Sequence, residues 1–343
     1  MNICTWIYEE EAADSRYAAP DRSSSGLAET ETAWKCAVVF FATSRKFNPE
    51  ARHVLFTNAK RIPAPGGFNL ERYLTEKLKV VIERLPAFSS APYGYDGMRK
   101  KPMYLFDVIR RLSRMEEEDR ALYAVMVPAC VWIRPSFIIR SQLERYGLAT
   151  LNLGDVPGTA PSPIRRIYED MLAAPLDRAP ESYDLACFAG QLKEIRLVAE
   201  ELDRVWDASL ERFRRNRHRL RTEAELLGFV YDKLGYRAGT ANPFIRTIRT
   251  GRGGNHRTER EDLYLTVWHA PDETDRGFAR LYRDIVKNAS FFWKSSPGAF
   301  RHYLSRRMGI PSRGGLARLR DLPEWVNAVR RRHRSGKKDE THG

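Results

Sequence analysis

Residues 121–135 read ALYAVMVPACVWIRP, and this stretch decides the fold. Its apolar run, residues 122–127, is too short for a membrane span and lacks the spacing of an amphipathic helix. Such a run favours a strand in a parallel sheet that helices cover on both faces. Pro128 has no N–H to donate, so strand pairing should stop there. Because ligands bind beyond the carboxyl ends of such strands, we expect a ligand site beside Ala129.

The composition is that of a globular chain that can bury a large core. The 343 residues are 43% hydrophobic and 11% aromatic, and no apolar stretch is long enough to cross a bilayer. Four cysteines lie far apart without a CxxC pair, and no signal peptide is visible, which favours a reduced, cytoplasmic protein without a zinc site.

The chain is basic, with 58 Lys and Arg against 44 Asp and Glu and a net charge of +14. Such an excess attracts polyanions, although an arginine-rich composition alone does not require it. The densest basic stretch, residues 212–221 (RFRRNRHRLR), lacks the regularly interleaved aromatic residues of a single-strand platform. The sequence therefore does not favour nucleic acid as a partner.

Two further buried strands are expected before the central one, at residues 37–43 (AVVFFAT) and 53–57 (HVLFT), as its parallel neighbours. Helices are expected at the ranges 69–85, 99–112, 136–145, 164–172 and 185–210, and the third of them should end at Gly147. Two later strands are expected at 244–250 and 263–269. We expect residues 1–32 to form a poorly ordered leader, with a short strand near Trp6 left open. An α/β domain should span residues 33–284, and residues 285–343 should form a helical extension with a basic tail.

Six segments, taken in order, resemble the GT-A fold nucleotide-diphospho-sugar glycosyltransferases, in particular those of the family 8-like type. They are AVVFFATS (37–44), HVLFTNA (53–59), KKPMYLFDVI (100–109), YAVMVPACVWIRP (123–135), RTEAELLGFVYDKLG (221–235) and YLTVWHAP (264–271). The resemblance implies a mostly parallel central sheet flanked by helices and the transfer of a hexose from a nucleotide sugar. In that family the central strand ends in Asp-x-Asp, which binds Mn²⁺ or Mg²⁺; here Val127, Pro128 and Ala129 stand in its place.

The resemblance also implies a set of nucleotide-sugar-binding residues. They come from the loop after the first strand, the start of the next helix, the end of the central strand and a late turn: Thr43, Ser44, Arg45, Lys100, Lys101, Tyr104, Ala129 and Arg276. Turn capping explains Thr43 and Ser44 equally well. The polarity of an exposed helix face explains the basic residues near Tyr104 equally well.

Glu223 and Asp107 are the candidate catalytic carboxylates by the same resemblance. Thr222 and Glu225 also fit a capping box, which needs no chemistry. His269 follows a strand where the family often completes its metal site, but the sequence supplies no carboxylate pair for it to join. We therefore expect no required metal.

Two functional hypotheses follow. In the first, the protein transfers a sugar from a UDP- or other nucleotide sugar to an unknown acceptor, and cationic side chains replace the metal. Arg249, Arg252 and Arg276 are among the available cations. In the second, it is a non-catalytic GT-A-like binding protein or the partner of an active paralogue.

Overall fold

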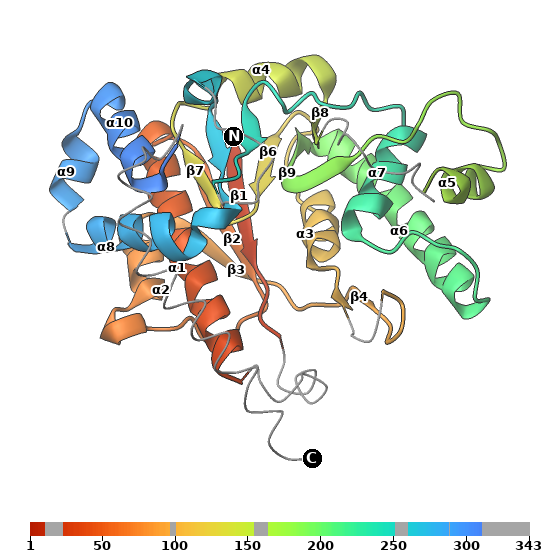
Figure 1. Cartoon of the computed structure of the whole chain (residues 1–343), viewed down its shortest axis with the longest axis horizontal. Helices are drawn as coiled ribbons and strands as arrows, with labels where there is room; N and C mark the ends of the chain where they lie inside the picture. The colour runs from red at the N-terminus through yellow and green to blue at the C-terminus, as the bar shows by residue number, and fades with distance from the viewer. Residues whose placement is uncertain (11–22, 97–100, 154–163, 251–259, 288, 311–343) are drawn as a thin grey trace, which may run out of the picture.

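We describe the protein from a computed structural model (Figure 1). The structure describes residues 1–10, 23–96, 101–153, 164–250, 260–287 and 289–310. Among these residues, no helix combines the length and the apolar character that crossing a membrane requires.

A six-stranded sheet forms the centre of the molecule, in the order β3-β2-β1-β6-β9-β8. Its strands are β1 (Asn2–Ile7), β2 (Arg52–Thr57), β3 (Val80–Arg84), β6 (Leu122–Met126), β8 (Leu148–Asn152) and β9 (Tyr183–Gln191). Neighbouring strands from β3 to β6 are parallel, and β9 runs antiparallel to both β6 and β8. Helices flank this sheet (Figure 1). The predicted α/β class with a mostly parallel central sheet is therefore confirmed.

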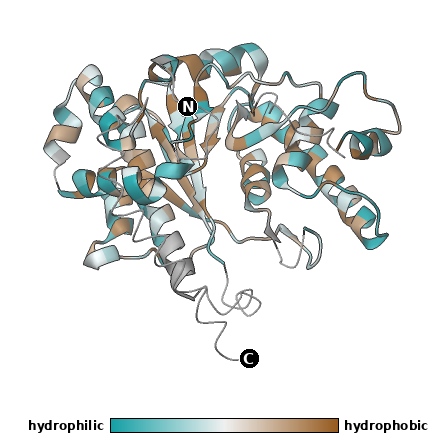
Figure 2. Cartoon of the chain, in the orientation of Figure 1, coloured by the Kyte–Doolittle hydropathy of each residue, from teal (hydrophilic) through white to brown (hydrophobic). Residues whose placement is uncertain are grey.

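Each face of the sheet has its own hydrophobic core. One core packs against α1 (Ser23–Phe47), α8 (Ala279–Lys287), α9 (Ala289–Lys294) and α10 (Pro297–Met308). The other packs against α3 (Tyr104–Ser113), α5 (Ile164–Leu172), α6 (Leu192–Arg214) and α7 (Glu223–Lys233). Figure 2 shows hydrophobic residues concentrated on the central strands and polar residues on the outer parts of the helices.

The position of β6 between two hydrophobic cores explains why its sequence is continuously apolar. Ala124 and Met126 pack into the core beside α1, whereas Tyr123 and Val125 pack into the core beside α3 and α6. These four residues are at most 1% exposed. A strand covered on both faces has no polar positions, which is why the run is continuously apolar.

The predicted strand at residues 37–43 is wrong, because these residues lie within α1. Phe40 and Phe41 are fully buried, and the helix contacts β7 (Cys130–Trp132), α8 and β1. A helix buried on all sides shows no amphipathic period, so its short apolar run has the appearance of a buried strand.

The predicted leader is also wrong at its start. Residues Asn2–Ile7 form β1, which lies between β2 and β6 at the middle of the sheet. Buried polar residues interrupt the apolar pattern of this strand; Asn2, for example, donates from its amide to Glu117 at 3.2 Å. Residues 11–22 lie outside the described part of the chain, and the other domain boundaries stay predictions.

Three of the predicted helices are helical over only part of their ranges. In the range 69–85, α2 (Leu70–Arg72) and a π-helical turn, η4 (Tyr73–Lys77), are followed by β3. In the range 99–112, the helix begins only at Tyr104. In the range 185–210, the helix begins only after β9. The helix predicted at 136–145 is α4 (Phe137–Tyr146), and it ends as expected at Gly147, whose φ is 74°.

Smaller elements complete the fold. A three-stranded sheet has the order β10-β11-β7, with β10 at Ile245–Thr247 and β11 at Val267–His269. Strands β4 (Ser90–Ala91) and β5 (Lys101–Pro102) pair with each other. The short helical turns are η3 (Pro65–Gly67), η5 (Arg260–Tyr264), η6 (Pro271–Glu273) and η7 (Thr274–Phe278).

Candidate functional site

The order in which the chain adds strands to the sheet reverses between β1 and β6. From β1 the chain builds β2 and β3 on one side, and β6 then lies on the other side of β1. In open α/β sheets, ligands bind beyond the carboxyl ends of the strands at such a switch point. The edge beyond Ile7 of β1 and Met126 of β6 is therefore the candidate ligand-binding edge.

The six-stranded and the three-stranded sheet both bring side chains to the end of β6. The backbone N–H of Val127 donates to the carbonyl of Ala186 at 3.2 Å, which places Asp184 of β9 just beyond the end of β6. The N–H of Ala270, which follows His269 at the end of β11, donates to the carbonyl of Ala129 at 3.0 Å. Asp184 and His269 thereby approach the same edge from two different sheets.

Thr247 of β10 connects these two residues (the Asp184–Thr247–His269 cluster). Its hydroxyl donates to the Asp184 carboxylate at 2.5 Å and lies 2.8 Å from Nδ1 of His269. A carboxylate only accepts, and the hydroxyl has a single hydrogen, so Nδ1 of the neutral imidazole must be the protonated nitrogen. Nε2 therefore carries the lone pair.

The imidazole of His269 is neutral at neutral pH. Its pKa is lowered to about 4, chiefly by burial and also by the nearby Arg249 guanidinium, while the carboxylates of Asp184 and Asp272 work in the opposite direction. A neutral imidazole with a bare Nε2 accepts a hydrogen bond from a ligand hydroxyl.

A cation is held beside this imidazole. Arg249 forms an ion pair with Asp272 at 3.1 Å, and the N–H of Thr250 donates to the same carboxylate at 3.0 Å. The hydroxyl of Thr250 donates to the buried Glu273 at 2.5 Å. These contacts anchor the guanidinium and the residue that follows the arginine, so its charge is positioned at the end of β11.

The donor atoms at this edge do not fit the divalent cation that the resemblance implies. Val127 and Ala129 have no side-chain ligand atoms, and the Asp184 carboxylate is bonded to Thr247. Over the ranges that the structure describes, no group of three or more His, Cys, Asp or Glu residues could hold a metal ion. Positive charge at this edge comes instead from Arg249.

The structure does not bring Thr43, Ser44 and Arg45 to this edge. They lie in the last turns of α1, which leads into the amino end of β2. The Thr43 hydroxyl accepts from the N–H of Trp132 at 3.2 Å, and that of Ser44 lies 2.8 Å from Nε2 of His53. Arg45 donates to the carbonyls of Leu78 and Lys79, immediately before β3, and to that of Pro49. Their role in nucleotide binding stays a prediction that this placement does not support.

The candidates around α3 make structural contacts. Tyr104 donates from its hydroxyl to the carbonyl of Leu85 at 2.8 Å, and Asp107 accepts from the backbone N–H groups of Phe88 and Ser89. Glu223 accepts from the N–H of Leu105 at 3.2 Å and so caps the amino end of α3. The predicted capping box of Thr222 and Glu225 is present at the start of α7.

The remaining candidates are placed as follows. Ala129 lies at the ligand edge, and Arg276 lies half-buried in η7, after β11. Lys101 contributes its backbone to β5, and Lys100 lies outside the described residues. None of these placements tests a role in binding.

Sequence reasoning missed Asp184 and Thr247 as site residues. Asp184 lies just before a range predicted as one long helix, and the structure divides that range into β9 and α6. The aromatic-rich stretch YDLACFAGQ, residues Tyr183–Gln191, was the signal for a strand. Thr247 had no signal beyond its position in a predicted strand.

The comparisons with known proteins show a likeness in structure but none in sequence. No protein-family model and no curated protein matches the chain. Among solved structures, the chain is similar to the apo structure of the bifunctional glycosyltransferase WbbM, with a TM-score of 0.49 and 8% sequence identity. The match covers 89% of this chain and 51% of that one, so the chain spans about half the length of that structure.

Proposed function

We propose that the protein transfers a hexosyl group from a UDP- or other nucleotide sugar to an acceptor, without a metal bound by a DxD motif. The observation that carries this proposal is the ion pair of Arg249 with Asp272, beside the neutral His269 at the end of β6. The order of the sheet supports it, because the switch point between β1 and β6 lies at the same edge.

The chemistry assigns a task to each group. When the bond between the anomeric carbon and the diphosphate oxygen breaks, negative charge develops on the leaving diphosphate. The guanidinium of Arg249 stabilises that charge by charge-assisted hydrogen bonds. His269 accepts a hydrogen bond at Nε2 from a sugar or acceptor hydroxyl, and Thr247 and Asp184 hold its ring in that orientation.

The alternative is a non-catalytic nucleotide-sugar-binding protein or the partner subunit of an active enzyme. Val127 and Ala129, which stand where the family has its carboxylates, favour this alternative. The two hypotheses differ in whether bound donor is consumed.

The test is nucleoside diphosphate release from UDP-, GDP- and dTDP-hexoses in the presence of EDTA, with a panel of sugar acceptors. The proposed function predicts release that persists in EDTA and falls at least about tenfold in Arg249→Ala. Arg52→Ala is a matched control, since Arg52 is equally exposed, at 46%, and pairs with Glu117 at 2.9 Å at the amino end of β2. Binding of a donor without any release would favour the alternative.

A further inference from the structure

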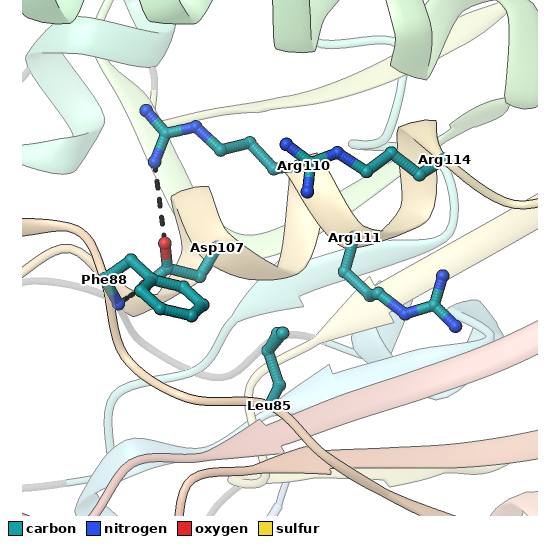
Figure 3. A pocket seen from close by; sticks show the side chains of 6 residues that line it. All are labelled: Leu85, Phe88, Asp107, Arg110, Arg111 and Arg114. Atoms are coloured by element: carbon teal, nitrogen blue, oxygen red, sulfur yellow. Dashed lines mark hydrogen bonds and ion pairs between the residues drawn. The ribbon is translucent and has the colours of Figure 1, made fainter.

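A cavity of about 330 Å³ lies between the outer face of α3 and the segment that follows β3 (Figure 3). Its lining is Leu85, Phe88, Asp107, Arg110, Arg111 and Arg114. This volume is at the lower end of the range for small-molecule sites, about 300–1,000 Å³. The cavity shares no residue with the Asp184–Thr247–His269 cluster.

Phe88 presents an unpacked aromatic ring at this cavity. Its side chain is exposed, with 76% of the residue accessible, yet its backbone is firmly held. The buried Asp107 accepts from the N–H of Phe88 at 2.9 Å, from the N–H of Ser89 at 3.0 Å and from the hydroxyl of Ser89 at 2.6 Å. A large apolar ring on an anchored backbone offers a preorganised contact surface, because little ordering is left to be lost on binding.

The charges around the cavity are balanced. Arg110 pairs with Asp203 at 2.5 Å and with Asp107 at 3.5 Å, and Arg111 pairs with Glu83. Arg114 is exposed, and no ion-pair partner is found for it among the residues that the structure describes. Asp107 is the carboxylate in the lining, and Asp203 and Glu83 lie just outside it, paired with Arg110 and Arg111. These three carboxylates offset the charge of the three arginines, and the cavity has both hydrogen-bond donors and acceptors.

This combination suits a polyhydroxylated neutral ligand better than a polyanion. Hydroxyl groups both donate and accept, so they can bond to guanidinium and carboxylate groups together. The apolar face of a sugar ring can pack on an aromatic ring such as Phe88, and Leu85 is a second apolar side chain in the lining (Figure 3). A polyanion would gain less, because the carboxylates paired with Arg110 and Arg111 already offset the charge of these two arginines.

We propose that this cavity is a binding subsite for a neutral saccharide, in which Phe88 packs against the sugar ring and Arg114 bonds to its hydroxyls. The proposal goes beyond the transfer reaction and does not depend on it, because it rests on the cavity alone. The subsite would hold a sugar unit of a glycan at a place other than the ligand edge of β6.

The test is saturation-transfer NMR on the full chain with maltose, cellobiose and lactose as neutral probes, and with glucose 6-phosphate and inorganic phosphate as charged probes. We expect saturation transfer to at least one neutral disaccharide. Phe88→Ala should weaken that binding by about fivefold or more, and Arg114→Ala should also weaken it. Binding should be unchanged in Phe137→Ala, the matched control on α4, where Phe137 is 74% exposed.

Arg249→Ala separates this proposal from the proposed function, because it should leave disaccharide binding intact whether or not the protein is a transferase. Circular dichroism melting checks that every variant is folded. The proposal is overturned if no neutral disaccharide binds at millimolar concentration, if Phe88→Ala binds as well as the parent, or if only the phosphorylated probes bind.

Discussion

The hydroxyl oxygen of Thr247 lies 2.8 Å from Nδ1 of His269, and this contact determines which imidazole nitrogen is available to a ligand. Since the same hydroxyl donates to Asp184, Nδ1 must carry the hydrogen and Nε2 the lone pair. We expect ¹⁵N NMR of the parent at pH 7 to show the Nδ1–H tautomer. Thr247→Val should change the tautomer balance. A dominant Nε2–H form in the parent would contradict the assignment.

The buried His53 and the half-buried His269 should make the stability depend on pH. Burial lowers the pKa of His269 to about 4 and that of His53 to about 3. In the unfolded chain these histidines take up protons near pH 6.5, whereas in the folded protein they stay neutral. Their contribution to the free energy of unfolding should therefore be complete above pH 6.5. It should then decrease as the pH falls from about 6.5 toward 4.

Urea unfolding of the parent and of His269→Gln between pH 4 and 8 measures this dependence. The variant should lose less stability on acidification than the parent does, by an amount on the order of 3 kcal/mol at most. Equal pH dependence in the two proteins would mean that His269 titrates normally.

Glu223 should contribute to the stability of α3. Its carboxylate accepts from the N–H of Leu105, and the N-cap residue Met103 forms no side-chain cap. Glu223→Ala should therefore lower the free energy of unfolding by about 1 kcal/mol, as the loss of a helix cap does. Glu223→Gln, which keeps an accepting oxygen, should lose less. Full stability in Glu223→Ala, combined with lost turnover, would instead support the predicted catalytic role.

Thr43 provides a second test of a predicted site residue. Its buried hydroxyl accepts from the N–H of Trp132, so Thr43→Val leaves that buried N–H without its acceptor. We expect a loss of about 1–3 kcal/mol in the free energy of unfolding, measured by urea denaturation. Nucleotide affinity should not change, and a marked loss of affinity in a stable Thr43→Val would restore the predicted binding role.

The sequence predicted the strands whose two faces are both buried. The apolar run of β6 and the run HVLFT of β2 are strands because helices cover both faces of the sheet. The helix start at Thr222 was predictable because capping depends on nearby residues alone.

The rest depended on tertiary contacts that a local pattern does not contain. The buried part of helix α1 is apolar on all sides, so its sequence has the pattern of a buried strand. Strand β1 carries buried polar residues such as Asn2, so its sequence lacks the pattern of a buried strand. The candidate site follows from the pairing of distant strands. Asp184, Thr247 and His269 come from β9, β10 and β11, and no sequence spacing reveals that they meet.

The most direct test of the central claim is calorimetric titration of UDP, GDP and dTDP in EDTA into the parent, Arg249→Ala and Arg52→Ala. A charge-assisted contact contributes about 1.5–3 kcal/mol, and 1.4 kcal/mol is a tenfold change in affinity. The proposed function predicts that the parent binds at least one of these diphosphates. It also predicts that Arg249→Ala weakens this binding at least about tenfold, while Arg52→Ala binds as the parent does. No binding by the parent, or equal affinity in Arg249→Ala, would contradict a metal-independent diphosphate site at the end of β6.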